Sequence, residues 1–187
     1  LLKATEDNED PRTIPAYNRM GYGLKTTYEK KRYKLGIIGF YAKDNQNSID
    51  SIPEVKNVLP KENLVISLEG EVKLGKSFTL QAEYAATAIT KDTRAEETEA
   101  LGKSPLSIIF NNRASTEYYN ALKTRLEYTI SRINLGLGYE RIDPGYETLG
   151  AYFFNNDFEN ITLDASNTFF KDKLTLALNI GYQRDDL

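Results

Sequence analysis

The sequence has no cysteine, no histidine and no tryptophan among its 187 residues. Without cysteine there are no disulfides and no thiolate chemistry, and without histidine the commonest general base and transition-metal ligand are missing. Serine and acidic residues are plentiful, but they form no nucleophile–base set. The net charge of −3 leaves no basic footprint for nucleic acid. We therefore expect no enzyme, no catalytic residue, no cofactor, no metal site and no nucleic-acid partner.

Long hydrophobic runs are also missing. No segment reaches the roughly 20 apolar residues of a membrane-spanning helix. What the sequence has instead is alternation, which is clearest in "RINLGLGYE" at residues 132–140. In an extended chain this pattern puts Ile133, Leu135, Leu137 and Tyr139 on one face and polar residues or glycine on the other.

The alternation recurs in eight segments, which predicts eight β-strands. They form four hairpins at residues 20–42, 63–89, 118–142 and 161–184, each closed by a short turn. Residues 1–19 and the long segments 43–62, 90–117 and 143–160 read as loops. Tight turns at one end and long loops at the other are typical of an outer-membrane barrel. We therefore predict an all-β fold, an antiparallel up-and-down transmembrane β-barrel, with residues 1–187 in one barrel region.

The apolar face carries aromatic residues at both of its ends, around an aliphatic middle. Such residues are favourable at the two interfaces between lipid and water. The predicted lipid-facing aromatic belts are Tyr22, Tyr28, Tyr33, Tyr41, Phe78, Tyr84, Tyr128, Tyr139, Phe169 and Tyr182.

The opposite face carries charges of both signs, which we expect to pair across neighbouring strands. In a membrane barrel this face lines the lumen. The predicted lumen-facing residues are Lys25, Glu29, Lys34, Glu69, Glu71, Lys73, Glu83, Lys123, Arg125, Glu127, Glu140 and Asp164. Alternation alone also fits a soluble barrel, in which the apolar face turns inward around a small apolar ligand.

The ends of the pattern do not match a self-contained barrel. The first strand runs into a tight turn and the last strand leaves one, so both outer ends lie on the long-loop side. We expect these eight strands to be an internal slice of a larger barrel, whose remaining strands cover both edges. The alternative is an eight-stranded barrel with both termini on the loop side.

Two quoted segments carry a family resemblance. "LGLGYERIDPGYETLGAYFFNNDFENITL" and the following "LALNIGYQRDDL" resemble parts of large outer-membrane β-barrel proteins of Bacteroidota. The likeness covers the last third of the chain best. It implies the bacterial outer membrane as location and a barrel as architecture, and it assigns no functional residue.

Three loop segments stand out. "IDPGYETLGAYFF" at residues 142–154 contains a Pro-Gly turn, and we expect an ordered outer loop, with folding across the barrel mouth or contact with a partner as alternatives. "SPLSIIFNN" at 104–112 is an apolar island, which predicts either contact with a partner or burial against the barrel rim. "DNQNSID" at 44–50 lacks the central glycine and final glutamate of a calcium loop and reads as a solvated turn.

The sequence as a whole predicts transport or translocation across the outer membrane, with the lipid bilayer and the remaining strands as partners. A structural or assembly subunit that binds other envelope proteins through its loops is the second reading. A soluble β-barrel that binds a small apolar ligand is the third.

Overall fold

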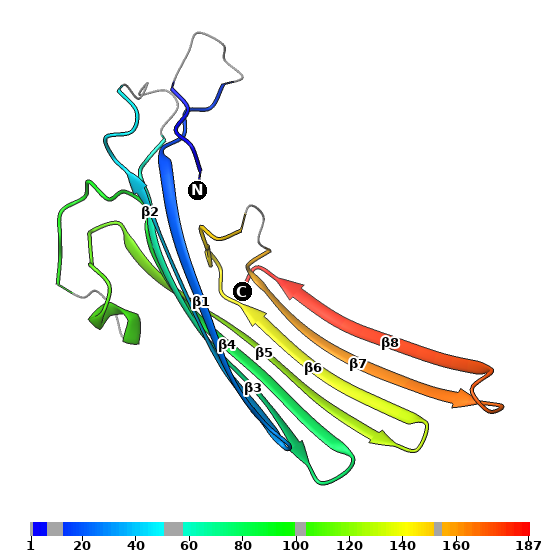
Figure 1. Cartoon of the computed structure of the whole chain (residues 1–187). Helices are drawn as coiled ribbons and strands as arrows, with labels where there is room; N and C mark the ends of the chain where they lie inside the picture. Colours follow the sequence, from blue (N-terminus) through cyan, green and yellow to red (C-terminus); the bar gives the residue numbers. More distant parts are fainter. Residues whose placement is uncertain (1, 7–12, 51–57, 100–103, 152–154) are drawn as a thin grey trace.

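The computed structural model describes residues 2–6, 13–50, 58–99, 104–151 and 155–187. These residues form one sheet and a short 3₁₀ helix, η2 (Pro105–Ile108), shown in Figure 1. The strands are β1 (Asn18–Lys30), β2 (Tyr33–Asn45), β3 (Glu62–Leu74), β4 (Phe78–Thr90), β5 (Thr116–Ile130), β6 (Ile133–Ile142), β7 (Phe158–Phe169) and β8 (Leu174–Asp185).

The strands pair antiparallel and strictly in sequence order, from β1 to β8. The predicted all-β, up-and-down arrangement of eight strands is therefore confirmed. The register aligns apolar residues from strand to strand, as in the pairs Phe78↔Tyr128 and Leu137↔Leu163. One face of the sheet, the apolar face, thus holds all the alternating apolar positions, and the other is the polar face.

The strands run further at the long-loop end, here called the loop end, than the sequence predicts. β1 begins at Asn18, inside the segment 1–19 expected to be loop, and β2 continues to Asn45. The extension has a polar cause: Arg19 Nε donates to Asp44 Oδ1 at 2.7 Å across the β1–β2 pair. Ion pairing continues the ladder beyond the point where apolar alternation stops, so a hydrophobic pattern underestimates the strand.

The sheet is not closed. Among the described residues, β1 pairs only with β2 along its length apart from one bridge to Leu2, and β8 pairs only with β7. An eight-stranded barrel closed on itself is therefore not what this chain forms. No helix in the described ranges is long and apolar enough to cross a membrane.

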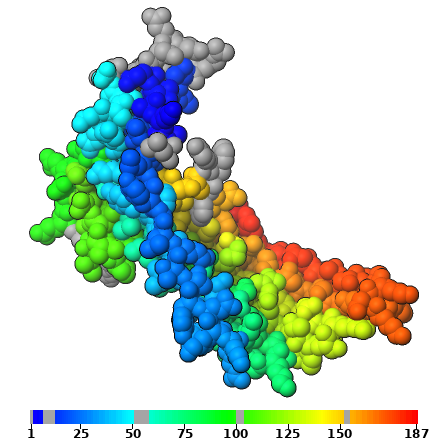
Figure 2. All heavy atoms as spheres, in the orientation of Figure 1, coloured from blue at the N-terminus to red at the C-terminus, as the bar shows by residue number. Residues whose placement is uncertain are grey.

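Among the described residues, the packed core lies at the loop end. Leu106 and Phe110, in and after η2, are buried against Ala86 and Ala88 on the apolar face of β4. Toward the tight turns, here called the turn end, the strands lie side by side from β1 to β8 (Figure 2), and every residue of β8 is exposed.

Two loops cover opposite faces of this end. The segment with η2 lies on the apolar face, whereas the loop after β6 lies on the polar face; Figure 1 shows them on the two sides of the sheet. Most of the apolar face below them has no second layer among the described residues.

Candidate functional site

The candidate site is the polar face, which forms the crowded inner side of the curved sheet. A Cβ added to Gly36 on this face would come within 2.5 Å of the Glu69 side chain, whereas one added to Gly39 on the apolar face would meet nothing within 4 Å. A hollow on the polar face is lined by Lys25, Glu69 and Arg125, among others. The curvature therefore brings polar side chains close together on one face and leaves apolar side chains further apart on the other.

One ion pair joins β1 to β3 over the strand between them, β2. Lys25 Nζ on β1 lies 2.8 Å from Glu69 Oε2 on β3. The register places Glu69 directly opposite Gly36 on the strand between them. Because Gly36 has no side chain, the Glu69 carboxylate can lie across β2 and reach the lysine.

The same arrangement recurs across β6. Arg125 Nη1 on β5 lies 2.7 Å from Asp164 Oδ2 on β7, and Arg125 Nε donates to Glu127 Oε1 at 2.8 Å. A Cβ at Gly136 on β6 would approach Arg125 Nη2 to 2.6 Å and Asp164 Oδ2 to 3.1 Å. The glycines of "LGLG" therefore leave room for a charged pair that spans two strands.

Further polar contacts on the same face join neighbouring strands. Lys123 Nζ lies 3.3 Å from Glu140 Oε2. Ser67 Oγ donates to Glu83 Oε1 at 2.9 Å, and Gln81 Nε2 donates to Glu71 Oε2 at 3.2 Å. Lys123–Glu140 is thus an ion pair of the expected kind between neighbouring strands, whereas Glu83 and Glu71 have neutral partners. Among the described residues these carboxylates form no unpaired acidic ring.

The loop after β6 folds back over the polar face and docks on β3 and β4. Lys61 Nζ lies 2.6 Å from Glu147 Oε1, and Thr87 Oγ1 donates to the Glu147 carbonyl at 2.9 Å. The Leu149 amide donates to Asn63 Oδ1 at 3.0 Å. Three strand spacings separate β6 from β3, so the loop crosses roughly 15 Å of the sheet. The loop therefore covers part of the polar face at the loop end.

The seat of this loop is built from buried polar side chains. Asn63 and Thr87 are both 0% exposed. Asn63 Nδ2 donates to Thr87 Oγ1 and to the Ala88 carbonyl, and Asn63 Oδ1 accepts from the Leu149 amide, so both ends of the side-chain amide are hydrogen-bonded. Such buried polar groups are stable only when hydrogen-bonded, which makes the docked position of the loop specific.

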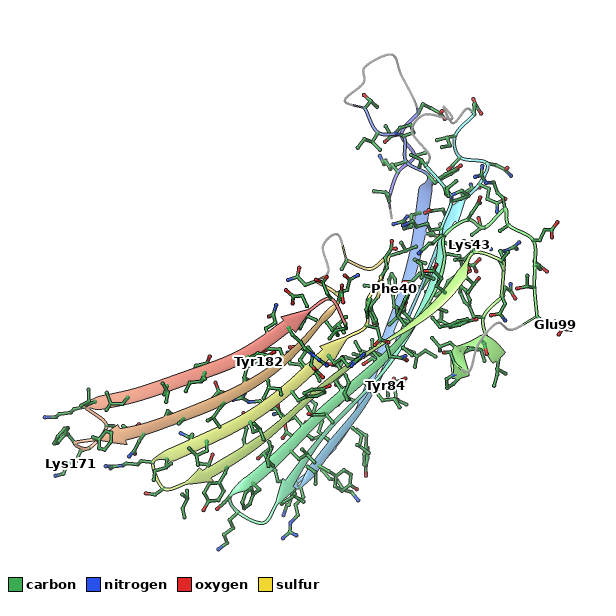
Figure 3. The ribbon with its side chains drawn as sticks, turned by 180° about the vertical axis from the view of Figure 1, so that it is seen from behind. Phe40, Lys43, Tyr84, Glu99, Lys171 and Tyr182 are labelled. Carbon is green, nitrogen blue, oxygen red and sulfur yellow. The ribbon has the colours of Figure 1, made fainter. Side chains whose placement is uncertain are left out.

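One aromatic residue on the polar face also contacts the loop after β6. Phe40, labelled in Figure 3, occupies a polar-face position of β2. The loop passes over its ring, because a Cβ on Gly150 would lie 3.2 Å from Phe40. Phe40 is therefore a contact for the loop, and with Asn63 and Thr87 it belongs to a site that the alternation pattern did not reveal. An aromatic that breaks the polar register is the signal that could have pointed to it.

The loop itself begins with a tight turn. The Tyr146 amide donates to the Asp143 carbonyl at 3.1 Å around Pro144 and Gly145, whose φ of +79° suits glycine. The turn buries Tyr146, which is 4% exposed. Burial, together with the nearby charge of Glu83, raises the pKa of Tyr146 to about 12. The described part of this segment is an ordered loop that crosses the polar face. Folding across a barrel mouth stays a prediction, because the sheet is not closed, and residues 152–154 lie outside the described residues.

The predicted residues divide between the two faces by register. The twelve expected lumen residues occupy polar-face positions and the ten expected belt aromatics occupy apolar-face positions. Tyr84 and Tyr182, labelled in Figure 3, are exposed on the apolar face. Tyr41 instead packs against the core cluster and donates to Glu62 Oε1 at 2.6 Å.

No metal centre is found in the part of the chain that the structure describes: no three His, Cys, Asp or Glu residues there could hold an ion. Asp44 is the first residue of the segment 44–50, and its carboxylate accepts hydrogen bonds from the Arg19 side chain and from the Lys61 backbone amide.

Comparison with protein families, curated proteins and solved structures finds no match for this chain.

We predict that Gly136→Ala destabilises the protein while the same change at Gly39 does not. The new methyl group at position 136 meets Arg125 and displaces its pair with Asp164, whereas position 39 has free space. We expect a free energy of unfolding about 1 kcal/mol lower for G136A than for G39A, measured by urea titration of the whole protein. Equal values for the two variants would contradict the role of the glycine.

We also predict a pH dependence of the docked loop. Because the folded pKa of Tyr146 is raised from 10.0 to about 12, its contribution to stability is complete below pH 10 and is lost as pH rises toward 12. The difference in tyrosinate absorbance between the whole protein and its Tyr146→Phe variant isolates this residue. A midpoint near 10 in that difference would show that Tyr146 is not buried by the loop.

Proposed function

We propose that this chain forms part of the wall of a β-barrel in the outer membrane of a Gram-negative bacterium, and that the polar face lines a lumen for the passage of solutes or polypeptide. The observation that carries the proposal is a sheet whose apolar face is bare over most of its length. Leu24, Ile37 and Leu178 are 73%, 58% and 57% exposed.

A bare apolar face of this extent needs a medium other than water. The exposed residues are continuous through the register, as in Leu24 beside Gly39, Ile37 beside Leu68, and Leu163 beside Ile180. Contiguous apolar patches of more than a few hundred Å² are rare on proteins surrounded by water. Hydrocarbon accepts such a face without cost, while the seven ladders satisfy the backbone groups of the inner strands.

The direction of curvature supports a membrane barrel over a soluble one. A soluble ligand-binding barrel turns its apolar face inward. Here the polar face is the crowded inner side, as the surroundings of Gly36 and Gly136 indicate. The apolar face is the open outer side, which is the orientation required in lipid.

The two open edges support partners within the membrane. β1 and β8 each have one row of backbone N–H and C=O groups that no strand of the described chain pairs along its length. Hydrocarbon cannot satisfy these groups, so further strands of the same barrel cover both edges. The resemblance to large Bacteroidota barrels fits this arrangement.

The second candidate is a structural or assembly subunit of an outer-membrane complex. The loop over the polar face favours it, because Glu147 contacts Lys61 just before β3 and Leu149 contacts Asn63 on β3, which reduces the open space of the proposed lumen. This candidate shares the membrane location and differs in whether the lumen conducts.

Conductance separates the two candidates. We expect the whole protein to give steady conductance steps in a planar bilayer, because its proposed lumen wall is polar and carries charges of both signs. Glu147→Ala removes the pair with Lys61, loosens the loop and should increase the step size. A protein that inserts but does not conduct, with or without the substitution, would favour the structural subunit.

Leu178→Arg tests the membrane location directly. Leu178 lies in the aliphatic middle of the apolar face of β8, and an arginine there should cost roughly 2–4 kcal/mol near the bilayer midplane. Ala177→Arg is the matched control, because its side chain belongs to the polar face of the same strand. The free energy of unfolding in lipid vesicles measures both, and an equal cost for the two variants would argue against lipid on the apolar face.

A further inference from the structure

The segment formed by η2 and the residues after it, Pro105–Phe110, has two different sides. Leu106 and Phe110 point to the sheet and are buried, whereas Ile108 and Ile109 between them point away and are 86% and 62% exposed. An ordered turn therefore holds two adjacent isoleucines outward from the apolar face.

Hydrogen bonds fix the turn that presents them. The Ile109 and Phe110 amides both donate to the Leu106 carbonyl, at 3.1 and 3.0 Å. Asn112 Nδ2 donates to the Ser107 carbonyl at 2.9 Å, and the Tyr118 hydroxyl of β5 bonds to Asn112. Hydrogen bonds within the turn and to β5 thus fix its conformation. The exposure of the two isoleucines is therefore a property of an ordered turn.

The height of the turn along the strands matches the upper boundary of an apolar band. Its contacts on β4 are Ala86 and Ala88, and Ala88 lies ten residues after Phe78 at the turn end. At ~3.3 Å per residue and a tilt of ~40° this is about 25 Å along the barrel axis, the height of the lipid-facing band of such barrels.

The isoleucines also continue the bare apolar face. Tyr84 lies directly below the covered alanines on the same face of β4 and is 43% exposed. Its hydroxyl donates to Asn120 Oδ1 at 2.6 Å, as expected of a tyrosine with one polar and one apolar side at a membrane interface. The outward side of the turn carries no charge between Ser104 and Asn112.

We propose that Ile108 and Ile109 form a lipid-binding site that inserts into the interfacial region of the bilayer at the loop end of the barrel. The inference rests on the proposed membrane location and extends it to a loop. The turn acts as a shelf: Leu106 and Phe110 attach it to the strands, and the two isoleucines attach it to the acyl chains just below the headgroups.

Tryptophan substitution tests the proposal, because this chain contains no tryptophan. Ile108→Trp places a reporter on the shelf, Leu178→Trp places one on the apolar face of β8, and Asn47→Trp places one on an exposed turn at the loop end. Each variant of the whole protein is reconstituted in phosphatidylcholine vesicles with or without bromine on the acyl chains, and the unsubstituted protein serves as the blank.

We expect the emission of I108W to be shifted to shorter wavelength than that of N47W and to lose intensity in brominated vesicles. The loss should be greater with bromine near the headgroup than with bromine near the chain end, whereas L178W should show the reverse.

Two results would overturn the proposal, and they are distinguishable. If bromine quenches L178W but leaves I108W unchanged, the shelf does not touch lipid; quenching of I108W by aqueous iodide then indicates solvent, and protection from both indicates a protein partner. If bromine quenches neither variant, the membrane location itself is wrong, and the lipid site fails with it.

Discussion

The structure depends on one constraint, the register of its seven antiparallel ladders. Successive side chains of a strand alternate between faces, so a slip of one residue in any ladder would transfer all apolar side chains of the following strands to the polar face. From Tyr22↔Tyr41 at one edge to Ile161↔Tyr182 at the other, no slip occurs. The separation of an apolar from a polar surface over most of the sheet, on which the proposed membrane location rests, follows from this register.

The polar face carries charges of both signs, and some of them pair over the strands between them. The pairs Lys25–Glu69 and Arg125–Asp164 each pass over a glycine and connect strands that are not neighbours. Partly exposed pairs of this kind each contribute only about 0–1 kcal/mol. They also fix the positions of long side chains over the glycine strands, where a Cβ at Gly36 or Gly136 would collide with them.

The loop end has a different physical character from the rest of the sheet. Two loops make it three layers thick: small residues, Ala86 and Ala88, let the η2 segment approach one face, and hydrogen-bonding residues, Asn63 and Thr87, receive the other loop. Conventional burial stabilises this end. Toward the turn end, the single layer of strands is stabilised by the hydrogen bonds of its ladders and by the medium that covers its apolar face.

The sequence by itself determined the eight strands, their tight turns, their order and the division of residues between two faces, because a period of two and a short turn are local properties of the chain. It did not reveal the extension of the strands by Arg19 and Asp44, the passage of ion pairs over Gly36 and Gly136, or the docking of the two loops on opposite faces. Those features were decided only by the tertiary structure. Lys61 and Glu147 are 86 residues apart in the chain, and so are Asn63 and Leu149. Contacts between such distant residues exist only after the ladders have set the strands side by side, and no local pattern encodes them.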